Sequence, residues 1–158
     1  MAEKKDKKDW EELAVTFKVS PEICEQYNQF YDKVIRPRIE KNYLAALISV
    51  VEGLIDMKIR EKLVNKISKN KSEKKVRFPY LRRYKIILSD RPPRKNVKAY
   101  TSCFPQGAII VYDPKNSEKD ICFSIAHELG NLLIKNEVIP GSSSENLADL
   151  FAHFASEK

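Results

Sequence analysis

Residues 117–133 read SEKDICFSIAHELGNLL, and this stretch decides the fold of the second half of the chain. It opens with a helix-start signal, because the Ser117 hydroxyl can accept from the third helical amide and the Asp120 carboxylate favours the positive end of the helix dipole. Apolar residues then recur at helical spacing and share about one third of the helix circumference: Ile121, Ile125, Leu129, Leu132 and Leu133. The pattern predicts a helix with this side against a core.

The polar side of the same helix carries His127 and Glu128, with Asn131 one turn later. Side chains four residues apart on a helix emerge side by side. In zinc peptidases, the motif His-Glu-x-x-His uses this spacing to place two imidazoles on one metal ion, and the glutamate takes a proton from water. This chain has Asn131 at the second histidine position, and an amide oxygen is a poorer zinc donor than imidazole, thiolate or carboxylate.

A second helix with a polar side is predicted by residues 142–154, SSSENLADLFAHF. Its apolar residues cluster on one side, and Glu145 and Asp149, four residues apart, share the other. A carboxylate from a second helix can supply a further metal ligand, and its neighbour one turn on can orient a ligating imidazole. The alternative is structural, since Glu145 can also complete a capping box with Ser142.

These two motifs together resemble the ImmA/IrrE family of metallopeptidases. The resemblance rests on Ile-Ala-His-Glu-Leu-Gly and the later Glu-x-x-Ala-Asp-x-Phe-Ala, and it covers about residues 84–155. It implies a zincin-like fold and cleavage of a protein substrate such as a transcriptional repressor. It also implies zinc held by His127 and Glu145, Glu128 as the catalytic base, Asp149 behind the ligating imidazole, and Asn131 as a weak or lost ligand.

Other interpretations remain open. A pseudopeptidase would keep the fold as a protein-binding or regulatory module, with the helices of 9–67 as its partner surface. A nucleic-acid-associated protein would use the net charge of +7, which gathers at 4–8, 66–77 and 82–98. Within the metal interpretation, His153 or Cys103 could replace the missing ligand, or a metal other than zinc could be used.

The whole chain is predicted to have an α+β fold: N-terminal helices and a small three-stranded sheet packed against the two site-bearing helices. Strands are expected at 84–89, 97–103 and 108–112. The predicted division is a disordered basic tail at 1–8, a helical segment at 9–67, a basic linker at 68–77 and a metallopeptidase-like domain at 78–158. The alternative is that 9–67 and 78–158 pack as one domain.

Composition supports a soluble protein with a core, since 42% of residues are hydrophobic and 32% are charged. No apolar run is long enough to span a bilayer, and the N-terminus has no apolar signal segment, so we expect a cytoplasmic protein without a membrane partner. The three cysteines, Cys24, Cys103 and Cys122, are an odd number without metal-ligand spacing. They are predicted to be reduced thiols.

Overall fold

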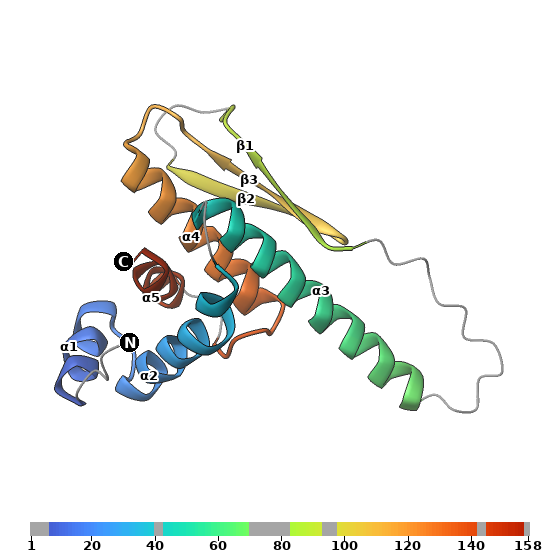
Figure 1. Cartoon of the computed structure of the whole chain (residues 1–158), viewed down its shortest axis with the longest axis horizontal. Helices are drawn as coiled ribbons and strands as arrows, with labels where there is room; N and C mark the ends of the chain where they lie inside the picture. Colours follow the sequence, from blue (N-terminus) through green and yellow to red (C-terminus); the bar gives the residue numbers. More distant parts are fainter. Residues whose placement is uncertain (1–6, 40–42, 70–82, 93–97, 142–144, 157–158) are drawn as a thin grey trace.

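The computed structural model of the chain describes residues 7–39, 43–69, 83–92, 98–141 and 145–156 (Figure 1). Helical elements come first in the described sequence: α1 (Lys7–Phe17), α2 (Pro21–Phe30), the π-helical turn η1 (Tyr31–Ile35), the 3-10 turn η2 (Arg36–Arg38) and α3 (Tyr43–Lys69). The strands and the last two helices follow: β1 (Lys85–Ser89), β2 (Ala99–Phe104), β3 (Gly107–Tyr112), α4 (Glu118–Lys135) and α5 (Glu145–Ser156).

The predicted α+β class is confirmed: the molecule has N-terminal helices, a three-stranded mixed sheet and two C-terminal helices packed together. Residues 1–6 of the predicted tail and 70–77 of the predicted linker lie outside the described residues. The described ends of these segments are helical, because α1 begins at Lys7 and α3 runs to Lys69. Much of the basic sequence on which a nucleic-acid role depends therefore lies outside the described part, and that role stays a prediction.

The sheet has the strand order β1-β3-β2, with β1 parallel and β2 antiparallel to β3. Ile86 pairs with Ala108, and Thr101 pairs with Ile110. Because side chains alternate along a strand, these residues share the sheet face that α3 and α4 cover (Figure 1). Gly107 is required where β3 begins, since a Cβ there would lie 2.2 Å from the Lys85 carbonyl oxygen.

One hydrophobic cluster joins the two halves of the chain. It contains Tyr27 of α2, Leu47 of α3, Ile110 of β3, Leu129 of α4 and Phe151 of α5, each no more than 1% exposed. The segments predicted at 9–67 and 78–158 therefore share a core. None of the helices in the described ranges has both the length and the apolar character needed to cross a lipid bilayer.

Helix α3 occupies the outer edge of β1 with side chains in place of a strand. Glu52 accepts from the Ile86 amide at 2.7 Å, and Asp56 accepts from the Tyr84 amide at 3.1 Å. The match is geometric, because four residues along a helix rise about 6 Å and two residues along a strand about 6.6 Å. Two carboxylates one turn apart thus satisfy two successive outward amides, so a further strand could not pair with β1 at Tyr84 and Ile86.

We predict that Glu52→Ala destabilises the protein by about 1.5–3 kcal/mol, because it removes a charge-assisted acceptor and leaves a part-buried amide unpaired. Urea unfolding measures the change. Glu61→Ala on the same helix is the control. The Glu61 side chain is 62% exposed, and its one ion pair, with Lys58, is long at 3.8 Å. The expected change is therefore below about 0.5 kcal/mol. Equal losses in the two variants would contradict the edge-sealing role of Glu52.

Candidate functional site

The site is built where α4 and α5 cross closely. Ser117 caps α4 as predicted, its hydroxyl accepting from the Asp120 amide at 3.2 Å. Gly130 allows the close approach of the helices, because a Cβ there would lie 3.0 Å from side-chain atoms of Phe151. Phe151 is 1% exposed and has little room to move. Ser142, the predicted cap of α5, lies outside the described residues.

His127 is held between two carboxylates of α5. Its Nδ1 lies 2.7 Å from Asp149 Oδ1, and its Nε2 lies 2.9 Å from Glu145 Oε2. The His127 side chain is 14% exposed, whereas that of Glu145 is 81% exposed. The imidazole therefore sits near the floor of the site and Glu145 at its rim. The structure brings together the three side chains that the sequence predicted as ligand, ligand and orienting group.

The contact between His127 Nε2 and Glu145 Oε2 needs a hydrogen atom or a cation between the two atoms. A neutral imidazole that donates from Nδ1 to Asp149 has a lone pair on Nε2, and that lone pair would face a carboxylate oxygen. A proton on Nε2 removes the repulsion, and so does a cation bound to both atoms. Two donors on one tetrahedral zinc ion lie about 3.3 Å apart, close to the 2.9 Å found here. The separation is that of an ordinary hydrogen-bonded ion pair, somewhat shorter than the spacing of two zinc donors.

A cavity of about 280 Å³ opens beside this cluster. His127, Glu128, Glu145 and Asp149 lie in its wall, with five further residues: Lys98, Ala99, Asp120, Phe123 and Ser124. Ser124 and Asp120 could have been found from the sequence, since they precede Glu128 at intervals of four on one side of the helix. Lys98 and Ala99 come from the start of β2, and no local pattern indicated them.

Glu128 reaches from α4 to the edge strand, where its Oε2 accepts from the Thr101 hydroxyl at 2.8 Å. Burial raises the pKa of the Glu128 carboxyl above its ordinary value. Hydrogen bonds from Thr101 and Asn131 and the nearby His127 oppose this rise, while the Glu145 charge adds to it. The charged form of Glu128 is therefore less stable than that of a surface glutamate. A raised carboxyl pKa suits a group that accepts a proton near neutral pH.

Asn131, the predicted weak or lost ligand, is engaged with Glu128. Its side-chain amide forms a hydrogen bond that lowers the pKa of the Glu128 carboxyl. His153 and Cys103, which the sequence offered as replacements for the missing ligand, do not line the cavity within the described residues. The His153 ring packs against that of Phe17 in a tilted arrangement, with ring centroids 5.4 Å apart, and Cys103 is exposed further along β2.

In the parts of the chain that the structure describes, no three His, Cys, Asp or Glu side chains are grouped so as to hold a metal ion. His127 and Glu145 form a pair, and Asp149 contacts the imidazole from its other nitrogen. The described donor set thus supplies two of the three protein ligands that catalytic zinc sites use.

We predict that Glu128→Gln stabilises the metal-free protein increasingly as pH rises. A carboxyl whose pKa is raised on folding contributes stability below its unfolded pKa, ordinarily 4.5, and this is lost as pH rises through the higher folded value. Urea unfolding between pH 4 and 8 with chelator present measures the difference from the parent protein. Glu118→Gln, exposed in the first turn of α4, is the control. A difference independent of pH would contradict the raised pKa.

Comparison with known proteins finds no match to any family model, curated protein or solved structure. The fold described above therefore rests on the chain's own coordinates, and the likeness to ImmA/IrrE metallopeptidases rests on the motif residues alone. What those residues do is taken up as a proposal.

Proposed function

We propose that the chain is a zincin-like peptidase domain of the ImmA/IrrE type, which uses zinc to hydrolyse a peptide bond in a protein substrate such as a transcriptional repressor. One observation carries the proposal. The imidazole of His127 is clasped by Glu145 and Asp149, and the Glu128 carboxylate lies in the wall of the same cavity. These are the residues and the relative positions that the resemblance implies.

Each residue then has a defined task. Zinc would be held by His127 Nε2 and Glu145, and when bound it supplies a Lewis acid for the carbonyl group and for water. Asp149 accepts from His127 Nδ1 and fixes the ring so that Nε2 faces the cavity. Glu128 takes the proton of the attacking water and passes it to the leaving amine nitrogen. Thr101 holds the Glu128 carboxylate against the edge strand.

The sheet offers a place for an extended substrate. The outer edge of β1 is taken by Glu52 and Asp56 of α3, whereas no described strand pairs with the outer side of β2. Strand β2 also contributes Ala99 to the cavity wall. A substrate segment that adds to this edge through main-chain hydrogen bonds would pass beside His127 and Glu128.

A second candidate, an inactive pseudopeptidase that binds a protein partner, is favoured by one observation. Asn131 places an amide where the resemblance implies an imidazole ligand, and that amide lowers the pKa of the Glu128 carboxyl. A site with two protein ligands binds zinc more weakly than one with three, and a carboxylate held by two donors is a weaker base. Metal binding and hydrolysis separate the two candidates.

We predict that Asn131→His raises zinc affinity by more than about 100-fold. Residues that only hydrogen-bond to metal ligands change affinity by about 10–100-fold, and a direct ligand should contribute more. Calorimetric titration of chelator-treated protein measures it. Gln29→His, which adds a histidine on exposed α2, should leave affinity unchanged. His127→Ala should abolish binding. An Asn131→His variant with parental affinity would show that the His127–Glu145 pair is not shaped for metal.

We predict that zinc-loaded protein hydrolyses labelled casein, and that Glu128→Gln reduces the rate by about 10²–10⁴-fold by removing the base. Release of soluble fluorescent fragments measures the rate. Activity that appears only in the Asn131→His variant would select the pseudopeptidase candidate, because the remaining groups would then be in place. No hydrolysis by the zinc-loaded parent or by zinc-loaded Asn131→His would rule out a hydrolase site able to act on casein.

A further inference from the structure

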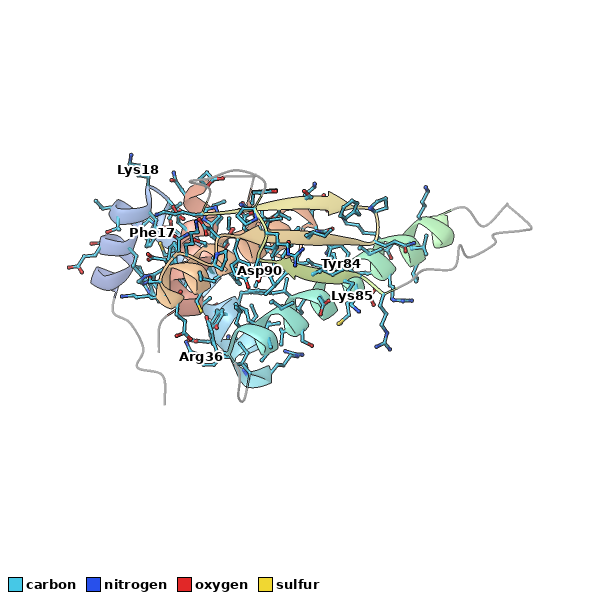
Figure 2. The ribbon with its side chains drawn as sticks, turned by 90° about the horizontal axis from the view of Figure 1, so that it is seen from above. Phe17, Lys18, Arg36, Tyr84, Lys85 and Asp90 are labelled. Carbon is cyan, nitrogen blue, oxygen red and sulfur yellow. The ribbon has the colours of Figure 1, made fainter. Side chains whose placement is uncertain are left out.

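The N-terminal helices pack against α5, the helix that carries two carboxylates of the site (Figure 1). The rings of Tyr31 and Phe151 meet edge to face, with centroids 6.0 Å apart. Phe17, labelled in Figure 2 at the end of α1, packs against His153 near the end of α5. The position of α5 therefore depends on the first helices of the chain as well as on α4.

One hydrogen bond joins α2 to the loop that leads into α5. The Tyr27 hydroxyl donates to the Pro140 carbonyl oxygen at 2.5 Å, although the two residues are 113 positions apart in the sequence. Tyr27 is 1% exposed. Burial raises the pKa of Tyr27 to about 12, so the hydroxyl keeps its proton near neutral pH and can donate it. Because the core holds the tyrosine ring, its hydroxyl is a fixed point of attachment for the Pro140 backbone.

Gly141, the next residue, allows the loop and α5 to meet. Its φ of +134° is a conformation that glycine adopts and other residues rarely do. A Cβ at this position would lie 2.4 Å from Leu147 Cδ1 and 3.1 Å from Tyr27 Oη. Leu147 is 8% exposed and belongs to the first turn of α5. The Tyr27 hydroxyl, the backbone of Pro140 and Gly141, and the first turn of α5 therefore form one continuous contact.

The position of Glu145 follows from this contact. Glu145 is the first residue of α5 and lies two residues before Leu147. Its side chain is 81% exposed, so neighbouring side chains do little to fix it, and its carboxylate lies where the backbone places it. That carboxylate is 2.9 Å from His127 Nε2. A displacement of the first turn of α5 would therefore change this distance directly.

We propose that Tyr27 is a positioning residue for Glu145, because its hydrogen bond to Pro140 fixes the start of α5 and hence the distance between Glu145 and His127. The part of this inference that concerns zinc rests on the proposed function, in which Glu145 is a ligand. It makes the N-terminal helices part of the peptidase unit, as the support of the helix that carries a ligand. The pseudopeptidase candidate uses the same helices as a surface for a partner.

The test compares two changes that each remove one buried hydroxyl. Tyr27→Phe removes the donor to Pro140 and keeps the ring that fills the core. Tyr84→Phe is the matched control: burial also raises the pKa of Tyr84 to about 12, and its hydroxyl forms a hydrogen bond with the Asn136 side chain at the end of α4. Figure 2 labels Tyr84 beside β1, at a distance from Phe17 and α1.

Zinc affinity is measured by calorimetric titration in the Asn131→His background, under conditions in which every variant is folded. Adding Tyr27→Phe should weaken zinc binding by about 10-fold, the lower end of the effect of groups that orient metal ligands. Adding Tyr84→Phe should leave the affinity unchanged. Equal losses with the two changes would overturn the proposal, since they would show no particular link between Tyr27 and Glu145.

Amide hydrogen exchange of the metal-free protein tests the same contact without zinc. Tyr27→Phe should speed exchange in the first two turns of α5 at least about 10-fold more than in α4 and β3, because local opening is specific to the segment that is released. Tyr84→Phe should not. Uniform acceleration along the chain, or no acceleration, would overturn the proposal, as would faster exchange in α5 with unchanged zinc affinity. If Asn131→His binds no zinc, the proposed function fails, and the exchange result alone decides whether Tyr27 positions the residue that begins α5.

Discussion

The imidazole of His127, bonded through both nitrogens to carboxylates of α5, is the interaction on which the site depends. It joins His127 to Asp149, 22 residues further along the chain, at 2.7 Å, and to Glu145, 18 residues further along, at 2.9 Å. Helices of this kind pack through their apolar sides, and here Gly130 against Phe151 brings the backbones close. The contacts of His127 with Glu145 and Asp149 lie beside the contact between Gly130 and Phe151. They fix the rotation of α5 about its own axis, because Glu145 and Asp149 must both face His127.

A second polar contact joins α4 to the sheet. Glu128 is the next residue after His127 and points about 100° away around the helix, which brings it to Thr101 on β2. One dipeptide therefore contacts two different elements, α5 and β2, through polar groups on either side. This position leaves the Glu128 carboxylate partly buried, and burial raises its pKa.

Sequence reasoning found what is local. Helical spacing and the Ser117 cap identified α4, and the separation of four between Glu145 and Asp149 placed both on one side of α5. It did not find Thr101, because a threonine in a strand has no distinguishing pattern and its partner is 27 residues away. Nor did it find the strand order β1-β3-β2, since alternation shows which residues share a face and not which strands are neighbours.

The polar contacts around His127 form with asparagine at position 131. Here His127 Nε2 contacts Glu145 and Nδ1 contacts Asp149, and the Thr101 hydroxyl donates to Glu128. Every one of these polar groups thus has a partner without a metal ion. Side-chain contacts alone therefore tie α5 to α4 and α4 to β2, and the arrangement around His127 follows from the packing of these three elements.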